Sequence, residues 1–182
     1  MLLIIVNGQP ATGKTTLSRH LAKETSVPLI AKDAIKEYLF DTIGYADREW
    51  SLMIGSQSTD FIWELADGVL GLGKSVMIEN AFYASFASKH IDDLQKRYPD
   101  LRVVELYCEA DPNILRKRFT ERYTDGDRHP GHVDDFNDQQ SISDAELARL
   151  YAPINPEKAV RINTNDPATI DYSSLVTLLE GK

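Results

Sequence analysis

The chain has 182 residues, of which 42% are hydrophobic and 26% are charged, and its formal net charge is −8. This composition is typical of a globular domain and excludes disordered and fibrous proteins, and no apolar run approaches the roughly 20 residues that span a membrane. The net acidity disfavours nucleic acid as a partner, because binding to its backbone depends on neutralising phosphates with Lys and Arg. We expect one domain over residues 1–182. The apolar start has no basic leader, so we also expect a cytoplasmic location; nothing in the sequence specifies an oligomeric state.

The first apolar run, residues 2–6, leads directly into the segment GQPATGKT at residues 8–15, which matches the phosphate-loop pattern G-x-x-x-x-G-K-[ST]. Glycines let backbone N–H groups approach phosphate oxygens, and the helix that follows adds its free N–H groups and positive dipole end. Lys14 supplies a mobile positive charge and Thr15 a hydroxyl ligand for Mg²⁺. The segment therefore predicts a nucleoside triphosphate site. Its residues are Gly8, Pro10, Ala11, Thr12, Gly13, Lys14, Thr15 and Thr16.

Asp33 follows the second apolar run, residues 28–31, and precedes a helical stretch over residues 34–40. A carboxylate at this edge of a sheet is suited to accepting the proton of an acceptor hydroxyl, and also to capping a helix. Lys36 lies one turn later and should face the same side. We interpret it either as a substrate-holding residue or as a solvated lysine.

A helical pattern runs over residues 48–72, and its aromatic residues indicate core packing, with a substrate-pocket wall as the alternative. The next apolar run, residues 75–78, ends at Glu79. A carboxylate there would bind a metal through water or contact the substrate, unless it is a strand-end acid facing solvent.

The fourth apolar run, residues 102–108, ends at Cys108, which we expect to be a small buried thiol. A basic segment follows, and within it Arg118 and Arg122 are spaced to share one helix face. Residues 123–140 have no sustained periodicity, which predicts a mobile loop carrying Arg128 that closes over the nucleotide. His129 and His132 lie in this loop, but few other ligands are near them in sequence, which disfavours a metal site.

The C-terminal part has a capping-box pattern at Ser143 and Glu146, and an apolar run over residues 160–163. Short apolar runs thus alternate with helical stretches along the whole chain. This alternation predicts an α/β fold with a five-stranded parallel sheet covered on both faces, and phosphate chemistry at the carboxyl ends of the strands.

With these residues in place, the chain resembles the small P-loop kinases of the nucleoside monophosphate kinase superfamily, in particular the AAA_33 group. That group is similar to chloramphenicol phosphotransferase, zeta-toxin-like kinases and the kinase domain of polynucleotide kinase. The resemblance implies a three-layer P-loop NTPase fold with a mobile lid at about residues 124–142. It also implies roles for individual residues, which are Asp33 as the base, Lys36 as a substrate contact, Arg118 and Arg122 stacking on adenine and reaching the phosphates, and Asn163 and Thr164 lining the adenine pocket.

We therefore expect an ATP- and Mg²⁺-dependent phosphotransferase that moves the γ-phosphate to a hydroxyl of a small-molecule acceptor. The expected catalytic residues are Lys14, Asp33, Arg118, Arg122 and Arg128. The alternatives are a kinase that acts on nucleic-acid ends, and a nucleotide-binding regulator that hydrolyses slowly and signals through a partner.

Overall fold

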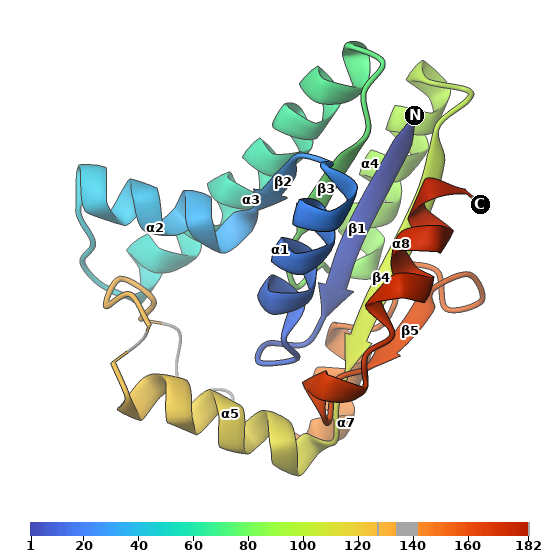
Figure 1. The fold of residues 1–182 in the computed structure, drawn as a ribbon. Helices are drawn as coiled ribbons and strands as arrows, with labels where there is room; N and C mark the ends of the chain where they lie inside the picture. The colour runs from blue at the N-terminus through green and yellow to red at the C-terminus, as the bar shows by residue number, and fades with distance from the viewer. Residues whose placement is uncertain (127, 134–141, 182) are drawn as a thin grey trace.

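The computed structural model describes residues 1–126, 128–133 and 142–181, and it places five parallel strands in one sheet in the order β2-β3-β1-β4-β5 (Figure 1). The strands lie where the apolar runs predict them. They are β1 (Leu2–Gly8), β2 (Leu29–Ala31), β3 (Val76–Glu79), β4 (Arg102–Glu109) and β5 (Val160–Asn163).

The helices alternate with these strands. They are α1 (Lys14–Thr25), α2 (Lys32–Ile43), α3 (Arg48–Gly71), α4 (Ala84–Arg97), α5 (Pro112–Thr124), α7 (Asp144–Leu150), the 3₁₀ turn η1 (Pro167–Thr169) and α8 (Tyr172–Glu180). None of the described helices is long and apolar enough to cross a membrane.

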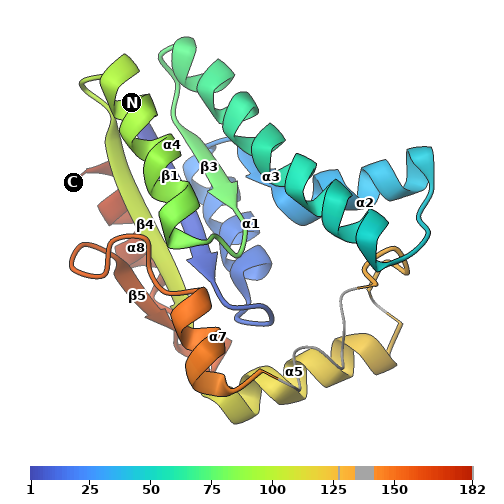
Figure 2. The same ribbon diagram turned by 180° about the vertical axis from the view of Figure 1, so that it is seen from behind.

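Helices cover both faces of the sheet, so the predicted three-layer architecture is confirmed (Figures 1 and 2). Leu3 and Ile5 of β1 point to one face, where they pack against α3 and α4. The alternate residues Ile4 and Val6 point to the other face, where they pack against α1 and α8. Every residue of β1 is buried, because this central strand is covered on both sides.

One local signal places the start of a helix correctly. Ser143 Oγ accepts a hydrogen bond from Glu146 N at 3.3 Å, and Glu146 Oε2 accepts one from Ser143 N at 3.1 Å, which is the predicted capping box of α7. Asp166 caps only the 3₁₀ turn η1, and the last helix begins after a second cap at Asp171.

The helical pattern over residues 48–72 predicts an apolar stripe that includes Met53 and Phe61 but not Trp63, and the structure confirms it only in part. Met53 and Phe61 are 45% and 50% exposed, whereas Trp63, which the helical pattern leaves off the stripe, is buried. Trp63 packs against the ring of Phe82 with the centroids 5.4 Å apart. The buried face of α3 therefore keeps Ile54, Ile62 and Leu70 of the predicted stripe but extends to Trp63.

Candidate active site

The phosphate loop lies between the carboxyl end of β1 and the start of α1. Gly8 and Gly13 have positive φ angles of 139° and 80°, which turn the backbone into a cradle. The loop also bonds to itself, because Thr12 Oγ1 and Lys14 Nζ both donate to the carbonyl oxygen of Gln9, at 2.8 and 2.7 Å. Burial lowers the pKa of Lys14, against the opposing effect of the nearby Glu79 carboxylate.

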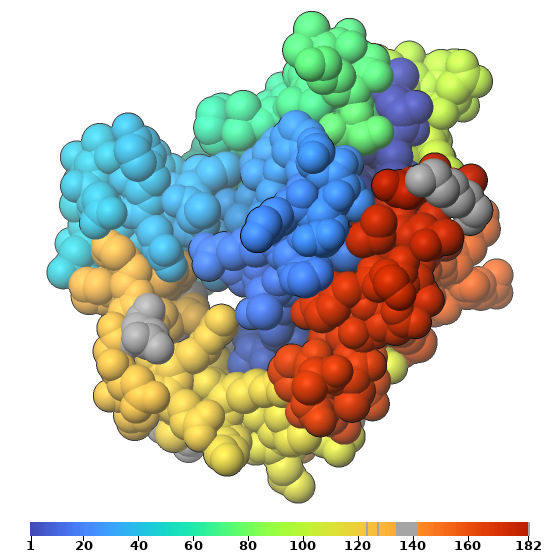
Figure 3. Space-filling view, in the orientation of Figure 1, coloured from blue at the N-terminus to red at the C-terminus, as the bar shows by residue number. Residues whose placement is uncertain are grey.

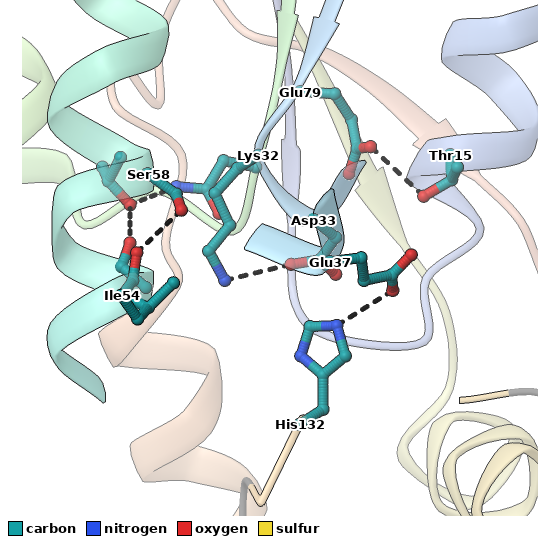
Figure 4. Close-up of polar contacts among 11 residues, drawn as sticks. Thr15, Lys32, Asp33, Glu37, Ile54, Ser58, Glu79 and His132 are labelled. Carbon is teal, nitrogen blue, oxygen red and sulfur yellow. Dashed lines mark hydrogen bonds and ion pairs between the residues drawn. The ribbon is translucent and has the colours of Figure 1, made fainter. Parts of the chain in front are cut away.

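Thr15 and Glu79 meet beside this loop. The Thr15 hydroxyl donates to Glu79 Oε2 at 3.2 Å, which joins the first turn of α1 to the last residue of β3 (Figure 4). Burial raises the pKa of Glu79, and the positive charge of Lys14 opposes that shift. The contact places two hard oxygen ligands side by side, as a Mg²⁺ site requires.

Asp33 lies in the first turn of α2, and Ala31 occupies the N-cap position, so Asp33 is not the helix cap. Its carboxylate accepts a hydrogen bond from Lys32 Nζ at 3.0 Å (Figure 4). Burial disfavours the charged form, but the positive charge and hydrogen bond of Lys32, with the nearby His132 and Arg128, outweigh it and hold the pKa of Asp33 at about 2. The carboxylate is therefore ionised at neutral pH.

The phosphate loop and Asp33 line one cavity of about 500 Å³. Thr15 and Glu79 line it as well, and so do the two arginines Arg122 and Arg128. The structure thus brings the predicted metal ligand, the predicted base and two of the predicted cations to a single space at the carboxyl edge of the sheet.

Lys36 also borders this cavity, but its side chain is buried between α2 and α3. Its ammonium lies 5.3 Å from the centre of the Phe40 ring, and it passes close to Gly55 of α3. Lys36 is therefore not the solvated lysine that the sequence leaves open.

Arg118 and Arg122 lie on the same helix but serve different neighbours. Arg122 lines the cavity, whereas Arg118 donates to the backbone carbonyls of Thr164 and Asn165 at 2.7 and 3.1 Å. Thr164 is fixed in turn by a hydrogen bond from its N–H to the Glu109 carbonyl at 2.8 Å. Asn163 is exposed at the end of β5. These residues form a second locus, at the loop that follows β5.

The AAA_33 family, described as an AAA domain, matches residues 3–149. The chain belongs to the AAA_33 family. Among solved structures, a candidate kinase of Chloroflexus aurantiacus J-10-fl is 34% identical, with a TM-score of 0.85 over 99% of this chain and 97% of that protein. The resemblance to small P-loop kinases is thereby confirmed.

Two more distant structures share the fold. A sugar kinase from Janibacter sp. HTCC2649 is 19% identical, with a TM-score of 0.62 over 100% of this chain and 95% of its own. A shikimate kinase from Bacteroides thetaiotaomicron is 17% identical, with a TM-score of 0.55 over 99% of this chain and 97% of its own. None of the curated proteins matches this chain significantly.

The AAA_33 chain also has a polar residue in its central strand that the sequence does not single out. Asn7 is fully buried, and its Oδ1 accepts hydrogen bonds from the N–H groups of Gly8 and Phe82 at 2.8 and 2.9 Å. Its Nδ2 donates to Glu105 Oε1 at 2.9 Å. Asn7 thus fixes both the start of the phosphate loop and the segment after β3. A polar residue placed between an apolar run and a phosphate loop is the only sequence signal for it.

The predicted lid lies partly outside the described residues, which leave out 127 and 134–141. Residues 128–133 of the predicted lid lie against α2 (Figure 3). His129 Nε2 lies 3.0 Å from Asp41 Oδ1, and His132 Nε2 lies 2.9 Å from Glu37 Oε1. The Phe40 ring lies against both imidazoles, with centroid distances of 5.4 and 5.7 Å. The two histidines therefore pair with carboxylates of α2.

Proposed function

We propose that this AAA_33 protein is an ATP- and Mg²⁺-dependent phosphotransferase that moves the γ-phosphate to a hydroxyl of a small-molecule acceptor. The observation that carries the proposal is that the phosphate loop and Asp33 line the same cavity of about 500 Å³. An anion cradle and a carboxylate thus face one space of the size that small ligands occupy. The kinase names of the structural neighbours support the reaction class.

The nucleotide phosphates belong in the cradle formed by the phosphate loop and the start of α1. A phosphate oxygen is a stronger acceptor for the Lys14 ammonium than the neutral Gln9 carbonyl that holds it in this structure. The added negative charge would also offset the burial that lowers the pKa of Lys14. The Lys14 ammonium would then leave the Gln9 carbonyl and bind the phosphates.

Thr15 and Glu79 fit a Mg²⁺ ion. Because the Thr15 hydroxyl donates its proton to Glu79, its lone pairs remain to face a cation. Glu79 would hold the ion directly or through water. A Mg²⁺ ion held there would supply positive charge that offsets the negative charge developing on the phosphate oxygens during transfer.

Asp33 would act mainly by orienting the acceptor. A carboxylate with a pKa of about 2 is a weak base, so it accepts a hydrogen bond from the acceptor hydroxyl and takes the proton late, once that oxygen has begun to bond to phosphorus. The bond between the acceptor oxygen and the γ-phosphorus forms, the bond from that phosphorus to the β,γ-bridging oxygen breaks, and ADP leaves. The proton passes to Asp33 and then to water.

The arginines would divide into two roles. Arg122 and Arg128, which line the cavity, would offset the negative charge of the transferring phosphoryl group. Arg118 is held by the Thr164 and Asn165 carbonyls, which would keep its planar guanidinium in place to stack on the nucleotide base. Asn163 would border the same base site.

The test is an ATP-consumption assay with and without a panel of alcohols, on the wild type and on Asp33→Asn. We expect acceptor-dependent ADP formation in the wild type and a kcat reduced by about 10²–10⁴-fold in the variant, the range for loss of a positioned proton acceptor. ADP binding, measured by calorimetry, should be unchanged. Asp100→Asn, at an exposed position in the turn before β4, is the matched control.

Two results would contradict the proposal. Full acceptor-dependent activity in Asp33→Asn would remove Asp33 from the reaction. If the wild type showed no acceptor-dependent turnover, the result would favour the alternative of a nucleotide-binding regulator that hydrolyses ATP slowly. The alternative of a kinase that acts on nucleic-acid ends is tested by the salt dependence of acceptor binding. Binding of a polyanionic acceptor would weaken steeply as the salt concentration is raised.

A further inference from the structure

The wall of the cavity changes its chemistry from one end to the other. Charged groups surround the phosphate loop and Asp33, whereas six apolar side chains line the part between α3, α4 and α7. These side chains are Leu52, Tyr83, Phe86, Ile142, Leu150 and Tyr151. Among them, Leu52 and Tyr83 are 55% and 50% exposed. Large apolar side chains gathered in a concavity and open to solvent are typical of a ligand site.

The aromatic rings of this wall are held in place from behind. The rings of Tyr83 and Tyr151 stack, with centroids 5.5 Å apart and an interplanar angle of 18°. The Phe86 ring packs against the His90 ring with the centroids 4.6 Å apart, and the His90 ring stacks on the buried Trp63 ring with the centroids 4.8 Å apart. Because the rings are already ordered, a ligand that covers them loses little affinity to side-chain ordering.

Apart from Leu52, the α3 side of the cavity is polar or charged. Arg48, Ser51, Thr59 and Asp60 line it, and Thr59 Oγ1 accepts a hydrogen bond from Asn80 Nδ2 at 3.4 Å. A ligand that satisfies both walls therefore needs hydroxyl or amide groups on one side and an apolar surface on the other.

The nucleotide base does not fit this apolar wall as well as an acceptor does. The phosphate loop continues into α1 on one face of the sheet, and Arg118 with Thr164 lies at the loop after β5. The rings of Tyr83 and Phe86 belong to the start of α4, on the opposite face, which also carries α3 (Figure 2). The apolar wall is thus left for the molecule that meets Asp33.

We propose that the acceptor is an alcohol that carries a flat, apolar ring, with its reacting hydroxyl against Asp33 and its ring between Tyr83, Phe86 and Tyr151. This inference rests on the proposed function, because it names the acceptor of that same site. It separates this chain from kinases whose acceptors are hydroxylated over their whole surface.

The test uses pairs of compounds that differ only in the ring. The probes are methyl and phenyl β-D-glucopyranoside, and methyl and phenyl β-D-galactopyranoside. Binding is measured by calorimetry on the whole protein with ADP and Mg²⁺, and turnover is measured separately with ATP. We expect the phenyl member of at least one pair to bind at least tenfold more tightly than its methyl partner.

Variants tie that preference to the wall. Tyr83→Ala and Phe86→Ala should each reduce the ratio of phenyl to methyl affinity at least fivefold without changing ADP affinity, and Tyr83→Phe should restore it. Tyr38→Ala and Phe61→Ala are matched controls, because both rings are exposed, at 68% and 50%, and neither lines the cavity. These controls should keep the wild-type ratio.

The outcomes separate this inference from the proposed function. Equal affinity within both pairs, or no binding of any probe, overturns the ring site. Equal affinity within both pairs, with phosphoryl transfer to both members, overturns the ring site and leaves a phosphotransferase. Ring-dependent binding without phosphoryl transfer supports the ring site and overturns the proposed function.

Discussion

At the scale of single residues, Gly8 and Gly13 of the phosphate loop carry different constraints. A Cβ atom on Gly8 would collide with the carbonyl oxygen of Cys108 on the neighbouring strand β4, whereas a Cβ atom on Gly13 would meet nothing within 4 Å. Both residues have positive φ angles. Gly8 is therefore required for space as well as for conformation, and Gly13 for conformation only.

Gly8→Ala should destabilise the protein by about 2 kcal/mol or more, because backbone strain adds to a contact with a backbone atom that cannot move aside. It should also weaken ADP binding at least tenfold, since β1 would have to shift away from β4 beneath the phosphate loop. Thermal unfolding and calorimetric titration with ADP measure the two effects.

Gly68→Ala is the control for Gly8→Ala. This glycine is exposed on α3 and a Cβ atom there meets nothing within 4 Å, so alanine should leave stability unchanged or raise it by up to about 1 kcal/mol. Gly13→Ala should cost about 1–2 kcal/mol from strain alone. If Gly8→Ala lowered the free energy of unfolding no more than Gly13→Ala does, the collision with Cys108 would make no contribution to stability.

At the scale of elements, α2 joins the two sides of the site. Asp33, Glu37 and Asp41 follow one another at intervals of four residues, so they share one face of the helix. Asp33 faces the cavity. Glu37 pairs with His132 (Figure 4), and Asp41 pairs with His129. The same helix therefore holds the proposed acceptor-orienting group and anchors the segment that brings Arg128 to the cavity.

Gly131 is the tightest point of that contact, because a Cβ atom on it would collide with the Phe40 ring. Gly131→Ala and Phe40→Ala should both loosen residues 128–133 from α2, the first by overcrowding and the second by removing the packing surface. Trypsin should then cut after Arg128 at least tenfold faster than in the wild type, as followed by mass spectrometry of the fragment that begins at His129.

Tyr38→Ala, which removes an exposed ring from the same helix, should leave the cleavage rate unchanged. Phosphoryl transfer should slow in parallel with the faster cleavage, because Arg128 loses its fixed position. Faster cleavage with full activity would show that the contact between α2 and residues 128–133 has no part in the reaction.

At the scale of the whole molecule, the fold and the core of the site follow from local sequence signals. Apolar runs gave all five strands, and the carboxyl ends of parallel strands necessarily share one edge, so Thr15, Asp33 and Glu79 could be placed near each other without coordinates. What local signals could not give was the partner of a long side chain. Arg118 donates to backbone carbonyls 46 and 47 residues away, and Lys36 packs against Gly55. These contacts depend on how the helices pack in the folded protein, which local patterns do not specify.

The least predictable feature is the buried carboxylate of Glu105, in the middle of β4. It accepts hydrogen bonds from Asn7 Nδ2 at 2.9 Å, from Ile154 N at 2.9 Å and from Asn155 N at 3.0 Å. In the sequence, an acid inside an apolar run indicates only a strand position. In the structure, it ties the end of β1 to the segment that leads into β5.

Glu105→Gln keeps the shape of the side chain but replaces one acceptor oxygen with an NH₂ donor, so at least one buried N–H faces another donor. An unsatisfied buried group costs about 1–3 kcal/mol, and in a chain of this size each kcal/mol lowers the Tm by about 2–4 °C.

Glu109→Gln, on the same strand but with a half-exposed side chain that pairs with Arg161, should change the free energy of unfolding by less than about 1 kcal/mol. Because Asn7 also accepts the Gly8 N–H, the loosened network should reach the phosphate loop, and ADP should bind more weakly in Glu105→Gln than in Glu109→Gln. Equal melting temperatures for the two variants would mean that the three donors find water instead, and that this network does not stabilise the sheet.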